Sequence, residues 1–151
     1  MSDVAPYEGR VALYFEDQPE QVQAIQDWLR VKLGLRLVQA TTLAEARSSL
    51  SSQKLDLIIL DIRIRDDEPG EQGGMQDWTR CGFNFLKDLR EGKFGGLTPH
   101  SIPVLVITCV VNTADVEEIL DAGNTSGGRC LYLAKPVRLD TVERAVRYLM
   151  A

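Results

Sequence analysis

The chain has 151 residues, of which 44% are hydrophobic and 26% are charged, and its formal net charge is −5. This composition predicts one globular domain over residues 1–151, and an acidic balance without a basic stripe argues against nucleic-acid binding by that domain. The first ten residues lack the apolar core of a signal peptide, no apolar run is long enough to span a bilayer, and three cysteines without metal-type spacing indicate reduced thiols in a cytoplasmic protein.

Short apolar segments alternate along the chain with segments whose apolar residues recur at helical spacing. In the first helical segment Pro19 suits an opening turn, and Thr42 and Glu45 have capping-box spacing at the start of the second. The predicted strands are 10–15, 35–40, 55–60, 102–108 and 130–134. The predicted helices that follow them are 17–34, 41–52, 82–92, 113–123 and 138–150.

Five strand–helix units in succession predict a parallel sheet with right-handed crossovers. The strands are continuous apolar runs, as expected when helices cover both faces of the sheet. We therefore expect an α/β fold, a doubly wound three-layer αβα sandwich whose five strands take the flavodoxin-like order 2-1-3-4-5. In that order the switch point lies between strands 1 and 3, and ligand sites form at the carboxyl ends of these strands.

Polar residues follow four of the predicted strands. Glu16 and Asp17 end the first strand, Asp61 ends the third, Thr108 ends the fourth, and Lys135 follows the fifth. Three crowded carboxylates repel one another and need a cation, and oxygen ligands of this kind suit Mg²⁺. A hydroxyl and an ammonium beside them suit the oxygens of a phosphoryl group, whereas no Walker-type loop indicates a nucleotide.

At these positions the sequence resembles the CheY-like receiver domain of two-component response regulators, over nearly its whole length. The motif YFEDQPE resembles the acidic pair of the first strand, and LDLIILDIR resembles the phosphoacceptor strand. The motif VLVITCVV resembles the strand that ends in Thr or Ser, and LYLAKPV resembles the Lys-Pro turn. All four motifs occur in the expected order, each at the end of a strand.

The resemblance implies that Asp61 is the phosphoacceptor. Glu16, Asp17 and Asp61 would bind Mg²⁺ together with the main-chain carbonyl of Arg63. Thr108 and Lys135 would stabilise the phosphoryl group.

Two further roles are implied by the same resemblance. Tyr132 matches the aromatic switch position, and Pro136 matches a cis-proline turn, which is plausible because cis peptide bonds occur mainly before proline.

The partners implied are a sensor histidine kinase or phosphotransfer protein and a downstream protein, with no membrane contact. A homodimer through the face formed by helix 113–123, strand 130–134 and helix 138–150 is a further arrangement that the resemblance allows. The chain would then be a signalling phosphoacceptor in a phosphorelay rather than an enzyme with turnover. The sequence leaves open whether the chain acts alone or is part of a larger protein.

Each site residue also has an ordinary interpretation. Asp61 could be a helix cap or a loop residue, and Tyr132 could be packed core with its hydroxyl at the surface. Glu16 and Asp17 could cap the first helix, Thr108 could be a strand residue, and Lys135 could be solvated. Two other functions stay open, namely a pseudo-receiver that binds partners without phosphorylation and a metal-dependent phosphohydrolase. The hydrolase would need a second acid just after the nucleophile, where this chain has Arg63.

A departure from the family is an acidic, Gly-rich insertion at about 66–80, between the third strand and the third helix. It contains five acidic residues and one arginine, a net charge of −4. A solvated loop and a docking lid beside the site are both consistent with this composition, with Met75 and Trp78 as anchors of the lid. A second, smaller excess is NTSGGR, 124–129.

Overall fold

The computed structural model describes residues 5–62, 75–109 and 113–151, with only the backbone described over 75–81. The predicted Arg63 ligand and most of the acidic insertion lie outside these residues. Five parallel strands form one sheet in the order β2-β1-β3-β4-β5, which confirms the predicted topology. The strands are β1 (Val11–Phe15), β2 (Arg36–Ala40), β3 (Leu57–Leu60), β4 (Val104–Thr108) and β5 (Cys130–Ala134). The helices are α1 (Gln23–Leu33), α2 (Leu43–Ser52), α3 (Met75–Arg90), α4 (Thr113–Gly123) and α5 (Leu139–Met150), with a 3₁₀ turn η1 at Pro19–Val22.

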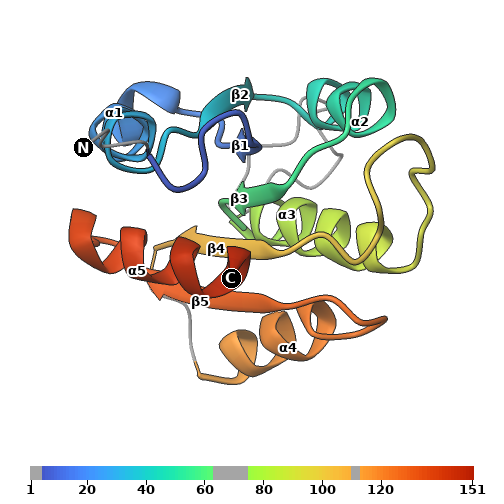
Figure 1. The fold of residues 1–151 in the computed structure, drawn as a ribbon. Coiled ribbons are helices and arrows are strands. Elements are labelled where there is room, and N and C mark those ends of the chain that lie inside the picture. The colour runs from blue at the N-terminus through green and yellow to red at the C-terminus, as the bar shows by residue number, and fades with distance from the viewer. Residues whose placement is uncertain (1–4, 63–74, 110–112) are drawn as a thin grey trace.

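The helices lie in two layers on opposite faces of the sheet (Figure 1). Helices α1 and α5 cover one face, where side chains such as Tyr14, Ile59 and Ile107 are buried. Helices α2, α3 and α4 cover the other face over a second apolar cluster. Burial from both sides explains why β3 and β4 are continuous apolar runs.

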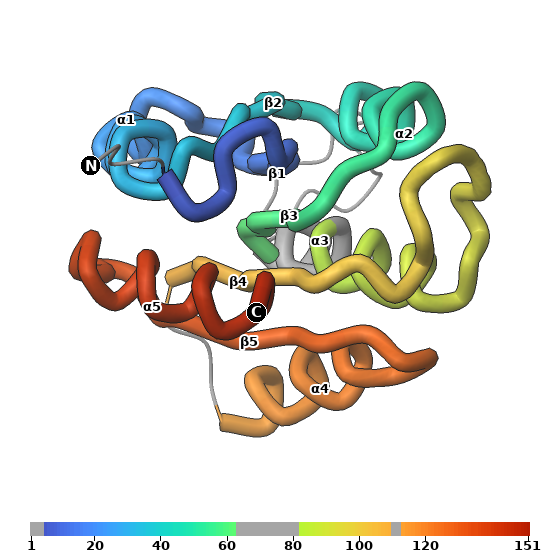
Figure 2. Tube along the Cα trace, viewed as in Figure 1, coloured from blue at the N-terminus to red at the C-terminus, as the bar shows by residue number. Residues whose placement is uncertain are grey.

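The chain crosses the sheet so that β1 and β3 are neighbours although about forty residues separate them in sequence (Figure 2). Strand β2 lies on one side of this pair, and β4 and β5 lie on the other. This arrangement places the carboxyl ends of β1, β3, β4 and β5 along one edge of the sheet, as the sequence predicted.

Helix α3 begins at Met75, whereas the sequence predicted its start at Gly82. Residues 75–80, assigned to the insertion, are therefore helical. Glycine weakens a helix prediction because it is about 1 kcal/mol worse than alanine inside a helix. Here tertiary packing requires the glycine inside the helix, because a Cβ atom at Gly82 would lie 2.4 Å from the carbonyl oxygen of Ile62. The glycine lets the helix approach the chain directly after Asp61.

The capping box predicted at α2 is present in part. The Thr42 hydroxyl accepts the Glu45 amide at 3.1 Å, as a capping residue should. The Glu45 carboxylate, however, accepts the amide and hydroxyl of Thr41, each at 2.8 Å, one residue before the expected position. These bonds lower the pKa of Glu45 below its ordinary value.

Candidate functional site

Backbone bonds continue the sheet just past the ends of the strands and fix the site residues. The amide of Glu16 donates to a carbonyl of β2, and the amide of Asp61 donates to a carbonyl of β1, each at 3.0 Å. The amide of Lys135 donates to the carbonyl of Thr108 at 2.7 Å. The backbone positions of four candidate site residues are therefore held by hydrogen bonds of the sheet, namely Glu16, Asp61, Thr108 and Lys135.

Asp61 lies at the centre of the site. Its side chain is nearly buried, and the whole residue is only 5% exposed. The Thr108 hydroxyl donates to Oδ1 of Asp61 at 2.6 Å, and Nζ of Lys135 donates to Oδ2 at 3.0 Å. Each carboxylate oxygen of Asp61 thus accepts one hydrogen bond, and the bond from Lys135 comes from a charged donor.

Lys135 connects two carboxylates. Its ammonium also donates to Oε1 of Glu16 at 3.0 Å, and its side chain is 20% exposed. Burial lowers the pKa of Lys135, but the carboxylates of Asp61 and Glu16 outweigh burial and raise it above the ordinary value. The lysine is therefore a charged part of the site, and the alternative of a freely solvated lysine is wrong.

Glu16, Asp17 and Asp61 form an acidic cluster in which one carboxylate oxygen from each lies within 4.8 Å of the others. Glu16 is 2% exposed, and its Oε2 is buried without a hydrogen-bond partner. Three oxygen donors with one unsatisfied lone-pair position fit a hard divalent cation such as Mg²⁺.

The acidic cluster changes the protonation of Glu16. Burial and the neighbouring Asp61 carboxyl raise the pKa of Glu16 to about 8, and Lys135 reverses only part of this rise. Near neutral pH a proton on Glu16 therefore offsets part of the crowded negative charge. A bound cation would serve the same purpose.

The remaining predicted residues lie beside the site. The Lys135–Pro136 peptide bond is cis, which confirms the predicted turn. Tyr132 lies on β5, is half-buried, and packs against the core under α2, α3 and α4. Thr108 already donates to Asp61, so a swing of its hydroxyl toward the site is not needed.

Sequence reasoning missed two buried polar residues. Tyr14 lies inside β1, two residues before Glu16, and its hydroxyl is buried without a hydrogen-bond partner. Arg90 lies at the end of α3 and is 2% exposed. The available signals were a tyrosine within the apolar run of β1 and an arginine four residues after the buried Leu86, on the inner face of its helix.

Known proteins resemble this chain over almost its whole length. Residues 12–147 match the response regulator receiver domain family. The KDP operon transcriptional regulatory protein KdpE of Escherichia coli K12 is 29% identical over 131 residues. The match covers 85% of this chain and 47% of that protein, so the chain spans about half the length of this curated relative.

Solved structures share the fold. A two-component response regulator from Clostridium difficile has a TM-score of 0.69 at 21% identity, covering 93% of this chain and 95% of that one. The receiver domain of sensor histidine kinase PA1611 from Pseudomonas aeruginosa, with a magnesium ion coordinated in its active site cleft, has a TM-score of 0.66 at 25% identity. That match covers 94% of this chain and 98% of the other.

Proposed function

Because this chain belongs to the response regulator receiver domain family, we propose that it accepts a phosphoryl group onto Asp61 in a two-component phosphorelay. The observation that carries the proposal is the surroundings of Asp61. Its carboxylate accepts from Thr108 and Lys135 and lies in one acidic cluster with Glu16 and Asp17. These are the groups that phosphoryl transfer to a carboxylate requires.

In the proposed reaction, a carboxylate oxygen of Asp61 attacks the phosphorus of a phosphohistidine on a sensor histidine kinase or phosphotransfer protein. A P–O bond forms, the P–N bond breaks, and its electron pair returns to the imidazole nitrogen. Lys135 and Thr108, which contact Asp61 already, would donate to oxygens of the phosphoryl group. Preorganised donors of this kind stabilise the developing charge without reorganisation.

The cation proposed for this site is Mg²⁺, held by Glu16, Asp17 and Asp61. When bound, it would neutralise negative charge as the phosphoryl group approaches. The magnesium ion in the Pseudomonas receiver domain supports this assignment. The main-chain carbonyl of Arg63 remains a proposed fourth ligand.

Labelling with acetyl phosphate tests the function. Intact-mass spectra should show one added phosphoryl group in wild-type protein with Mg²⁺, and none with EDTA or in Asp61→Asn. Asp27→Asn, an exposed aspartate on α1, serves as the matched control and should label normally. Equal labelling of Asp61→Asn, or labelling in EDTA, would exclude Asp61 as the metal-dependent acceptor.

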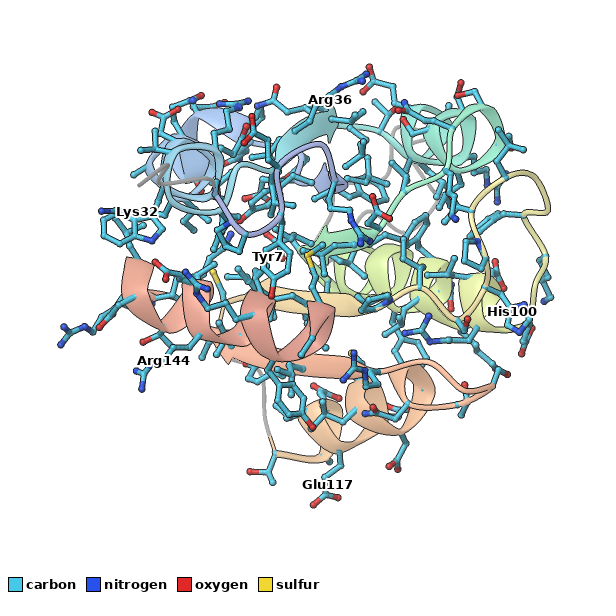
Figure 3. The ribbon with its side chains drawn as sticks, viewed as in Figure 1. Tyr7, Lys32, Arg36, His100, Glu117 and Arg144 are labelled. Atoms are coloured by element: carbon cyan, nitrogen blue, oxygen red, sulfur yellow. The ribbon has the colours of Figure 1, made fainter. Side chains whose placement is uncertain are left out.

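A partner surface is proposed on the face formed by α4, β5 and α5. Exposed acidic residues such as Glu117 lie on α4, and exposed arginines such as Arg144 lie on α5 (Figure 3). These opposite charges are complementary in a two-fold homodimer that pairs α4 with α5. The same face would serve a downstream protein partner. Sedimentation with and without beryllofluoride should show dimers that Glu117→Lys weakens and Arg36→Glu, on β2 at the opposite edge of the sheet, does not.

We further propose the cytoplasm as the compartment. Both cysteines in the part of the chain with described side chains, Cys109 and Cys130, are free thiols, in keeping with a reducing environment. None of the described helices is both long and apolar enough to cross a membrane.

A further inference from the structure

Three buried side-chain atoms lack a hydrogen-bond partner among the described residues. They are the hydroxyl of Tyr14, Oε2 of Glu16 and Nε2 of Gln26. A buried polar group without a partner costs roughly 1–3 kcal/mol, so each one requires an explanation.

The three atoms lie on one side of the sheet. Tyr14 and Glu16 are two residues apart on an extended chain, so their side chains point to the same face. This face is covered by α1, which carries Gln26. Oε1 of Gln26 accepts from Nε2 of Gln39 at 2.6 Å, and Gln39 is the direct neighbour of Tyr14 across the β1–β2 pair.

Tyr14 and Glu16 are chemically complementary. The phenol offers a donor proton, and Oε2 of Glu16 is an acceptor without a donor once Glu16 is ionised, as it is above its raised pKa or with a cation bound. Tyr14 is 2% exposed, so bulk water does not satisfy its hydroxyl. The hydroxyl therefore requires a partner inside the protein, and the unpartnered Oε2 of Glu16 lies on the same face of the sheet.

We propose that one buried water accepts from the Tyr14 hydroxyl and donates to Oε2 of Glu16, and thereby positions this carboxylate for a divalent cation. Lys135 holds the other oxygen, Oε1, at 3.0 Å. With both oxygens held, the ionised carboxylate keeps one orientation toward the cation. Tyr14 is then a positioning residue that acts on the cation through Glu16, as outer-shell partners of metal ligands do.

The inference rests on the proposed magnesium site, and the experiment separates the two. Calorimetric titration with Mg²⁺ alone compares wild type with Tyr14→Phe, Tyr7→Phe and Glu16→Gln. Tyr14→Phe should weaken Mg²⁺ binding about 10-fold, the lower end of outer-shell effects. Tyr7→Phe is the matched control, because the Tyr7 hydroxyl bonds the carbonyl of Arg147 on α5, and it should bind like wild type. Tyr14→Phe should add no further loss in the Glu16→Gln background.

A second readout needs no cation. Nuclear magnetic resonance on protein with ¹³Cζ-labelled tyrosine should show that the Tyr14 hydroxyl proton exchanges slowly with solvent. The chemical shift of this proton should change in Glu16→Gln. If instead the hydroxyl is simply unpaired, Tyr14→Phe will bind Mg²⁺ like wild type and will be more stable, which overturns the inference alone. Wild-type protein that does not bind Mg²⁺ overturns the magnesium site and the positioning role together.

Discussion

At the residue scale, Asp61 shares a nearly buried site with the carboxylate of Glu16 and the ammonium of Lys135. Burial and the Asp61 carboxylate, whose oxygen lies within 4.8 Å, both disfavour the charged form of Glu16 and raise its pKa. The ordinary pKa of Glu16 is 4.5, and its pKa in the folded protein is about 8. Between these two pH values the folded protein keeps a proton on Glu16 that the unfolded chain has already released. The free energy of unfolding should therefore fall as pH rises through this window, when no cation is bound.

Replacing Asp61 should relieve this cost. We expect Asp61→Asn to raise the free energy of unfolding at pH 7 by about 1 kcal/mol, the value of roughly one pKa unit. The asparagine oxygen can still accept from Thr108, and Lys135 still pairs with Glu16. Urea denaturation in EDTA measures the change, and the fall in stability with pH should become shallower.

Asp27→Asn is the control for this prediction, because surface substitutions usually change stability by less than about 0.5 kcal/mol. A lower urea midpoint for Asp61→Asn than for the control would show that Asp61 stabilises the metal-free fold. The repulsion argument would then be wrong.

At the element scale, the guanidinium of Arg90 ties together the end of the sheet opposite the site. It donates to the carbonyls of Gly123 at the end of α4, Ile102 before β4 and Arg129 before β5. A further bond reaches the carbonyl of His100. The NTSGGR segment before β5 thus has a structural reason, since Gly128 leaves the space that the guanidinium fills.

Gly82 is the point where α3 approaches the active edge of the sheet. Gly82→Ala gains about 1 kcal/mol of helix propensity, but its Cβ would lie 2.4–2.7 Å from backbone atoms of Ile62. Backbone atoms cannot move aside as a flexible side chain can, so the steric clash should outweigh the gain in helix propensity. We expect the free energy of unfolding of the variant to fall by about 1–3 kcal/mol. Thermal unfolding measures the loss.

The same substitution should slow labelling of Asp61 by acetyl phosphate, because Ile62 directly follows this proposed acceptor. Ser48→Ala, at an exposed position within α2, is the control: it gains helix propensity without a clash and should label normally. Unchanged stability and labelling in Gly82→Ala would show that the close approach is not required.

At the scale of the whole molecule, the proposed function requires a signal to pass from Asp61 to a partner surface. Thr108 and Tyr132 lie on neighbouring strands and point to the same face of the sheet, the one under α3 and α4. Thr108 already bonds Asp61, so a phosphoryl group would extend this contact and press on the core beside Tyr132. Tyr132 is therefore our candidate for the packing switch between the site and the α4–β5–α5 face.

Nuclear magnetic resonance with and without beryllofluoride tests this switch. Beryllofluoride should change the backbone chemical shifts of residues 113–123 and 130–148. These changes should be smaller in Thr108→Ala, because the Thr108 hydroxyl connects Asp61 to β4. Val104→Ala, on the same face of β4 but paired with Cys130 and not with Tyr132, controls for loss of volume in the core. Perturbations confined to 62–82 would assign the output to the acidic insertion instead.

Much of this protein followed from local pattern. The apolar runs and helical spacing predicted every strand and helix, and α4 and β5 were predicted to the residue. The strand order required only the rule for doubly wound sheets. Asp61, Thr108 and Lys135 could be assigned to one edge because each directly follows a strand, and the carboxyl ends of parallel strands lie together.

The sequence by itself determined the fold class and which residues meet at the sheet edge, because strand periodicity and strand ends are local properties. Only the tertiary structure decided where α3 begins, since a glycine that weakens an isolated helix is required where that helix meets Ile62. It also decided that Arg90 is buried against four carbonyls and that the Tyr14 hydroxyl is buried without a hydrogen-bond partner. Whether a buried polar group has a partner depends on residues distant in sequence, and no local pattern contains that information.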